Sequence, residues 1–249
     1  TPIATTTPDH RWHKAAHALM TLARVDSATA RLHLDRFVGS TIWGERLAAT
    51  VAAATMRDVA LLRRLAGDRD HNVQETAITG LARITGHADD SLFISALASP
   101  GYQVVLAAAT ALNVSKDPRV VPAAIAALDR ISFEKRETSR DPRIALLARI
   151  GELGNIDNSR AILRYAADFD STVAVSAATI LSRWQGRTIA PATKPLPIRT
   201  EPLAKLLLQG EARLIVTMAP SSGGGSFTIR LFAGEAPATA ARLLRLARE

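Results

Sequence analysis

A four-residue spacing of apolar side chains recurs along most of the chain and constrains its fold more than any other feature. Residues four apart lie on one face of a helix, so each run predicts a helix with one buried stripe. Looser runs begin at Leu47 with Val51 and at Ile144 with Ala148. The clear runs are Val73, Ala77, Leu81; Val104, Ala108, Leu112; and Val173, Ala177, Leu181.

Capping residues and second apolar runs complete each repeated unit. Asp70 and Asp170 stand just before two of the stripes, where a carboxylate accepts hydrogen bonds from the free N–H groups of the first turn. Each unit is therefore predicted to be a helix–turn–helix of roughly thirty residues, and one such pair cannot bury its apolar face without stacking on the next. The second runs are Val59, Leu62, Leu65; Leu92, Phe93, Leu97; Val121, Ile125, Leu128; and Ile162, Leu163, Ala166.

The spacing D-x-x-V-x-x-x-A-x-x-x-L at Asp70–Leu81, with partial copies later, resembles the HEAT-repeat family in its short bacterial form. The resemblance covers about residues 43–186, and residues 1–42 are expected to form a divergent first helix pair. It implies a mainly α fold, an α-solenoid of helix pairs, and is silent about activity. An ordinary helical bundle is the alternative fold. A solenoid surface suits protein partners.

One interval between stripes is about ten residues longer than its neighbours, and its last part, residues 131–140, is highly charged. Insertions in repeats emerge as loops on one face, often the binding face. The alternative is an ordinary solvated loop. The candidate partner-binding residues are Phe133, Lys135, Arg136 and Arg140, with Trp184 as an aromatic anchor.

The composition changes after Gly186. Four prolines between residues 187 and 202 exclude a continuous helix there. Residues 187–210 are therefore expected to form a proline-rich linker that ends in a short helix at about Leu203–Gln209. The tail then alternates as a strand over 212–218, turns over 221–225 and forms a second strand over 226–232. A helix is predicted from 236 to 249, and Phe227, Ile229 and Leu231 share one strand face.

The second strand and the start of the last helix follow an Ile-x-Leu and Glu-Ala-Pro-x-Thr pattern, formed by Ile229, Leu231, Glu235, Ala236, Pro237 and Thr239, with Leu246 and Ala247 further on. On these residues, 211–247 resemble the beginning of a cyclophilin-type peptidyl-prolyl isomerase domain. Arg242 and Leu243 depart from the Asn-Phe pair of that family, and the glycine turn is longer than usual. The family's catalytic Arg, Phe, Gln and His come later in the domain, so the chain as given is expected to be inactive. The resemblance implies that the parent protein isomerises X-Pro bonds.

Charge argues against a nucleic-acid partner, although the net charge is +8. Residues 43–186 carry 17 basic and 16 acidic side chains, whereas a nucleic-acid binder concentrates Lys and Arg on one face. This balance also disfavours a DNA-binding HEAT protein of the glycosylase type. The absence of cysteine excludes thiolate metal sites and leaves the compartment open, with the periplasm or cell envelope favoured over the cytoplasm. No apolar run is long enough to span a bilayer.

No catalytic residue, cofactor, metal or small-molecule ligand is expected. His10, His13 and His17 share a helical face and could ligate zinc, but no carboxylate or further histidine is placed to complete the shell. A polar helix face is therefore the favoured interpretation. Two functions remain: a protein-binding scaffold that carries the start of an isomerase domain, or a non-catalytic structural or accessory subunit of a larger complex.

Overall fold

The computed structural model describes residues 11–196, 212–220 and 223–247. The fold of these residues is mainly helical with a two-stranded antiparallel sheet, as predicted at the level of fold class. The chain divides into a larger unit of residues 9–195 and a smaller unit that contains residues 196–249. Among the described helices, none combines the length and the apolar character that crossing a bilayer requires.

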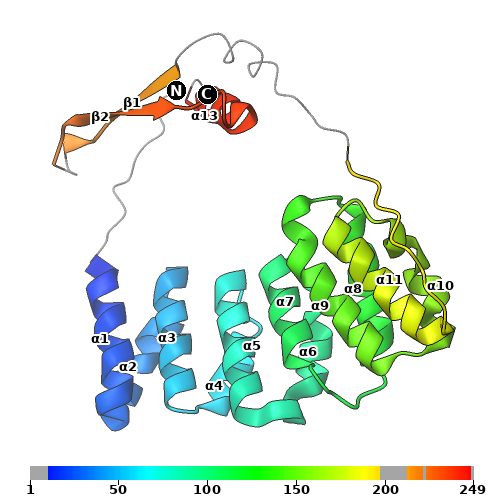
Figure 1. Cartoon of the computed structure of the whole chain (residues 1–249). Coiled ribbons are helices and arrows are strands. Elements are labelled where there is room, and N and C mark those ends of the chain that lie inside the picture. The colour runs from blue at the N-terminus through cyan, green and yellow to red at the C-terminus, as the bar shows by residue number, and fades with distance from the viewer. Residues whose placement is uncertain (1–10, 197–211, 221–222, 248–249) are drawn as a thin grey trace. The chain divides into compact units, whose positions relative to one another are not determined.

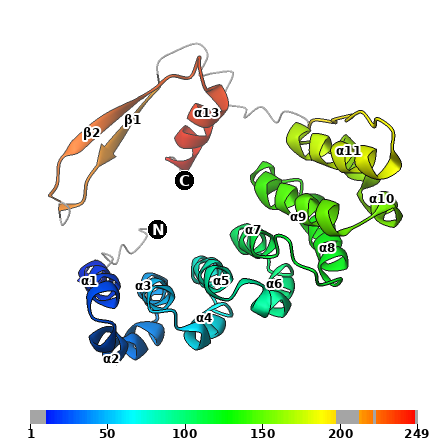
Figure 2. The ribbon, with the colours of Figure 1, turned by 60° about the horizontal axis from the view of Figure 1, so that its bottom comes forward.

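Two rows of helices build the larger unit (Figure 1). Figure 2 shows that the first row follows the inner side of a curve and the second row its outer side. The inner row contains α1 (Arg11–Val25), α3 (Trp43–Thr55), α5 (His71–Thr85), α7 (Tyr102–Ala111), α9 (Arg140–Leu153) and α11 (Ser171–Gln185), each packed against the next. The outer row contains α2 (Ser27–Val38), α4 (Val59–Leu65), α6 (Asp90–Ala96), α8 (Val120–Phe133), α10 (Ser159–Ile162) and the 3-10 helix η4 (Leu163–Ala167).

The three clear stripes occupy equivalent positions in the inner row. Val73, Val104 and Val173 are each the third residue of their helix, and each is at most 1% exposed. The predicted caps are also present, since the carboxylates of Asp70 and Asp170 accept hydrogen bonds from backbone N–H groups at 2.9 Å. The repeated pattern therefore predicted the core of these three helices correctly.

The two looser stripes, which begin at Leu47 and at Ile144, were placed two residues too far along their helices. Leu47, Val51, Ile144 and Ala148 are half-buried, whereas other positions on α3 and α9 face the core. The third residues of α3 and α9 are Glu45 and Pro142, and the residues that follow them are the buried Arg46 and Arg143. A search for apolar side chains does not select arginine as a core residue, so it selected the neighbouring aliphatic residues instead. The buried apolar residues are Ala48, Ala49, Ala52 and Ala53 on α3, and Leu146, Leu147 and Ile150 on α9.

Arg46 and Arg143 tie consecutive inner-row helices together. Arg46 donates from Nε and Nη2 to the carboxylate of Asp68, at 2.7 and 2.8 Å, just before α5 begins. Arg143 donates from Nη1 to both carboxylate oxygens of Asp168, at 2.7 Å, just before α11 begins. Each aspartate also accepts the N–H of the residue two positions on, at 2.8 Å, so the two sites match in detail.

Uncharged residues replace both partners at the step from α5 to α7. Gln74 on α5 corresponds to the arginine, and Ser99 corresponds to the aspartate. The hydroxyl of Ser99 accepts the N–H of Gly101 at 3.2 Å, which repeats the backbone contact of Asp68 and Asp168. The backbone geometry of the loop is therefore the same at this step, although the ion pair is absent there.

The long interval between stripes lengthens an outer helix as well as a loop. Helix α8 has 14 residues, whereas α4 and α6 have 7 each, and Ile131 near its end is fully buried. The prediction of a loop is therefore wrong for residues 131–133. A short turn and the 3-10 helix η2 (Glu137–Ser139) complete the connection.

Residues 187–196, the described part of the expected linker, form no helix or strand. The N–H of Ala192 donates to the carbonyl of Ala166 at 2.7 Å, and that of Lys194 donates to the carbonyl of Asp168 at 3.1 Å. This part of the segment is thus held on the last helices of the larger unit. The rest of the linker, 197–210, and the helix expected at 203–209 lie outside the described residues.

The smaller unit contains β1 (Ala212–Thr217), β2 (Ser226–Leu231) and α13 (Pro237–Leu246), as the tail sequence predicted. The strands pair antiparallel, with Leu214 opposite Ile229 and Val216 opposite Phe227. Side chains alternate across a strand, so these four residues share the face predicted for Phe227, Ile229 and Leu231.

Candidate interaction surface

The inner row presents a mostly uncharged face on the side away from its core, with Glu75 and Arg83 as charged residues on α5. On each helix from α3 to α11, the fifth and ninth residues lie opposite the buried positions. We call these ten residues the inner-face set. The fifth residues are Leu47, Glu75, Leu106, Ile144 and Val175, and the ninth residues are Val51, Thr79, Thr110, Ala148 and Thr179.

Aliphatic side chains in the inner-face set are only partly covered, although Leu47 and Ile144 also pack against the edge of the core. Four of the five fifth residues are aliphatic, and Val175 is 50% exposed. Contiguous apolar surface of this kind marks a site of interaction more often than an isolated exposed leucine does. Glu75 is the one charged member of the set, and the set contains no lysine or arginine.

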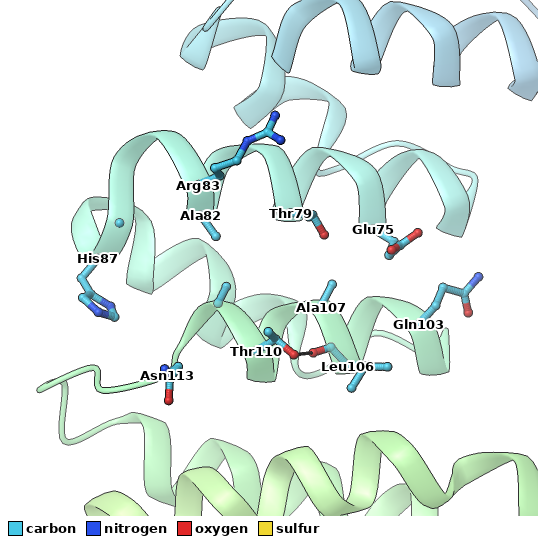
Figure 3. A pocket seen from close by; sticks show the side chains of 12 residues that line it. Glu75, Thr79, Ala82, Arg83, His87, Gln103, Leu106, Ala107, Thr110 and Asn113 are labelled. Carbon is cyan, nitrogen blue, oxygen red and sulfur yellow. Dashed lines mark hydrogen bonds between the residues drawn. The ribbon is translucent and has the colours of Figure 1, made fainter. Parts of the chain in front are cut away.

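A groove of about 500 Å³ opens on this face between α5 and α7 (Figure 3). Ala82, Ala107 and Ala111 contribute small side chains to it, so the two helices leave room between them. Glu75 and Gln103 lie at one end of the groove, and His87 and Asn113 lie at the other. The groove is thus lined mainly by apolar atoms, with the hydroxyls of Thr79 and Thr110 in its middle, Arg83 on α5 and polar side chains at both ends.

Two of the three threonine hydroxyls in the inner-face set already donate their protons within their own helix. Thr110 donates from Oγ1 to the carbonyl of Leu106, at 2.8 Å, and Thr179 donates to the carbonyl of Val175, also at 2.8 Å. Both threonines are exposed. A hydroxyl oxygen keeps acceptor capacity after it donates, so these oxygens can accept N–H groups from a ligand.

The predicted partner-binding residues lie elsewhere. Phe133 ends α8 and is 88% exposed, and Lys135 follows it in the left-handed region, with φ at 51°. Arg136 pairs with Glu134 at 3.1 Å, and Arg140 pairs with Asp141 at 3.2 Å. These four residues gather around the connection from α8 to α9 and do not belong to the inner-face set.

Trp184 is not an exposed anchor. Its side chain is half-buried near the end of α11 and packs against the main hydrophobic core. A Cβ atom at Gly154 would lie 3.2 Å from the indole, so the glycine leaves space for the ring. A packing role accounts for this tryptophan.

The residues that resemble the cyclophilin motif are spread along the smaller unit. Ile229 and Leu231 lie on β2, Pro237 begins α13, and Leu246 ends it. Glu235, Ala236, Thr239 and Ala247 are exposed.

Histidine chemistry is not supported at either place where it could arise. His13 and His17 are exposed on α1, and His10 lies outside the described residues. In the described part of the chain, no three histidine, aspartate or glutamate side chains gather to hold a metal. His87 Nδ1 lies 3.1 Å from Asp90, but the hydroxyl of Ser115 also donates to Asp90 and not to the histidine. The imidazole therefore cannot accept the serine proton, and this is not a nucleophile–base pair.

No family model matches the chain, and comparison with curated proteins finds no relative. The surface is best interpreted from its own chemistry. Sequence reasoning missed the inner-face set, although a signal was present. In two of the three clear stripes, an aliphatic residue stands two positions after the first valine, as Leu106 and Val175, and the third stripe has Glu75 there.

Proposed function

We propose that the larger unit is an α-solenoid of the HEAT kind and acts as a protein-binding scaffold. The inner-face set carries this proposal, because it offers partly exposed aliphatic side chains on four of five successive helices. A solenoid of stacked helix pairs binds partners on such a concave surface. The same set holds no basic residue, and a phosphate backbone would require several.

We further propose that the parent protein is a cyclophilin-type peptidyl-prolyl isomerase that recruits its clients through the solenoid. The strand, turn and helix of the smaller unit, with the residues that resemble the family's opening motif, support this. Rotation about a peptide bond meets a barrier of about 18–20 kcal/mol. The resemblance implies that the enzyme lowers this barrier by holding the twisted amide, without a covalent step. The competing function is a non-catalytic subunit of a larger complex.

Site-specific photo-crosslinking tests the scaffold function. A benzoylphenylalanine is placed at Ile144 or Val175 on the inner face, or at Leu32 or Leu163 on the outer row, where Leu32 is 81% exposed. We expect one polypeptide to crosslink in the native cell from the inner positions and not from the outer ones. Adducts that form equally from the outer positions, or from none of the four, contradict the proposal.

Activity of the whole parent protein separates the two functions. A cyclophilin-type enzyme accelerates cis–trans exchange in an X-Pro peptide. A parent protein that crosslinks from its inner face and leaves the exchange rate unchanged is an accessory subunit.

A further inference from the structure

We infer that the inner-face set takes an extended, polyproline II-like segment with an aliphatic side chain at every third residue and a basic side chain against Glu75. This inference rests on the proposed scaffold function and names the partner's chemistry. It assigns X-Pro-rich segments, which adopt this conformation readily, as the clients of the solenoid.

Spacing is the first argument. Packed helices lie about 8–10 Å apart, so successive fifth residues from Leu47 to Val175 repeat at about that distance. A polyproline II helix has three residues per turn and rises about 3.1 Å per residue, which returns every third side chain to the same side after about 9.3 Å. An α-helical ligand needs seven residues, about 10.5 Å, to do so. The shorter repeat fits the concave side of a curve better.

Hydrogen bonding is the second argument. Proline has no backbone N–H, but the N–H groups of the other residues in a polyproline II segment have no partner within the segment, whereas those of a helix are satisfied internally except at its N-terminus. The hydroxyl oxygens of Thr110 and Thr179 already donate their protons and present acceptors beside the aliphatic residues. This surface therefore matches a ligand that brings free N–H groups.

Charge is the third argument and sets the position along the ligand. Glu75 replaces an aliphatic residue at the second of the five fifth positions, and it faces Gln103 across the groove (Figure 3). A ligand with lysine or arginine at the matching position gains an ion pair, and one with an aliphatic side chain there does not. The matching position is the second or the fourth of five contacts, according to the direction of the ligand.

Fluorescence anisotropy with designed peptides and the full chain tests the inference. Two probes of 15 residues carry leucine at positions 1, 4, 7, 10 and 13, with lysine replacing position 4 in one and position 10 in the other, and proline or serine elsewhere. The controls have the same composition, one with contacts at every fourth residue and one redesigned as an amphipathic helix. We expect one of the two probes with contacts at every third residue to bind at least tenfold more tightly than both controls. This ratio corresponds to a difference in binding free energy of about 1.4 kcal/mol. Equal affinity for either control overturns the inference.

Two variants locate the site. Leu106→Lys and Val175→Lys place a charge on the inner face. Leu106 is half-buried and Val175 is exposed, so both changes leave the core intact. Each should lower the affinity for the probe about tenfold. Leu32→Lys, on the outer row, should leave its affinity unchanged. Loss of binding in all three, or in none, overturns the assignment of the surface. Thermal unfolding of each variant confirms that it is folded.

A charge exchange tests the contact with Glu75. Glu75→Lys should weaken the lysine probe, and a probe with glutamate in place of the lysine should bind this variant better than the natural chain. No exchange of preference overturns the charge assignment. If Ile144 and Val175 crosslink a partner but the probes with contacts at every third residue bind no better than the controls, this inference is wrong and the scaffold function stands. If the inner-face positions form no crosslink, both are wrong.

Discussion

Arg143 of α9 forms a fully buried ion pair with Asp168, the residue that precedes the cap of α11 by two positions. Nη1 of the arginine lies 2.7 Å from both carboxylate oxygens, and the arginine side chain is 0% exposed. Its guanidinium also lies 4.3 Å from the centre of the Phe169 ring. Two charges removed from water in this way stabilise each other only while both are present.

Loss of one partner of this pair should be costly. Arg143→Met leaves the Asp168 carboxylate buried without its counter-ion, and we expect the free energy of unfolding to fall by about 3–5 kcal/mol. Urea denaturation at neutral pH measures the change. Arg140→Met removes an exposed partner of Asp141 and should change stability by no more than about 1 kcal/mol. Similar losses in the two variants would show that burial of the Arg143 pair has no energetic consequence.

The Arg46–Asp68 pair should make stability depend on acidity. Burial by itself raises the pKa of Asp68, but hydrogen bonds from Arg46 and from the N–H of Asp70 outweigh it, so the pKa lies below the usual 3.8. A carboxyl whose folded pKa is lowered contributes stability above its unfolded pKa and loses it as the pH falls through the folded value. The free energy of unfolding should therefore fall as the pH drops below about 3.8.

Asp68→Asn and Arg46→Met should each reduce this pH dependence, since either change removes the cause of the lowered pKa. Both variants should also be less stable than the natural chain near neutrality. Urea titrations at several values between pH 6 and pH 2.5 give the slopes. An unchanged slope in Asp68→Asn would assign the acid sensitivity to other carboxylates.

Gly151 should tolerate no larger side chain. A Cβ atom there would lie 2.9 Å from Cγ1 of Ile180 on α11, closer than ordinary contact. Gly151→Val should therefore push α9 and α11 apart and lower the free energy of unfolding by about 1–3 kcal/mol. Ala148→Val adds bulk to the same helix on the inner face and should cost less than about 1 kcal/mol. If both variants unfold at the same urea concentration, close packing at Gly151 is not important.

The chain of 249 residues should not catalyse prolyl isomerisation. On the proposed relationship to cyclophilins, residues 211–247 correspond to the opening of the domain, and no catalytic residue of that family is matched in these residues. The described part of the tail has two strands, which leave both sheet edges without partners. A protease-coupled assay with an X-Pro peptide, run beside an intact cyclophilin, measures the rate. Turnover comparable to that enzyme would contradict the expectation.

Sequence reasoning succeeded where the core is apolar and failed where it is charged. Val73, Val104 and Val173 could be placed because aliphatic side chains at helical spacing have one low-energy environment. Arg46 and Arg143 could not, because their partners Asp68 and Asp168 are 22 and 25 residues away and a buried arginine looks like a surface residue in the sequence. The same error hid the inner-face set, since Leu47 and Ile144 were assigned to the core.

The ion pairs also restrict how the array could gain or lose units during evolution, because each pair has its arginine in one unit and its aspartate in the next. Recombination that joins α4 directly to the segment before α7 would set Arg46 against Ser99 and bury a charge without a carboxylate. A longer deletion that joins α4 to the segment before α11 would instead set Arg46 against Asp168 and restore the pair. Viable descendants should therefore differ by three units at this junction more readily than by one.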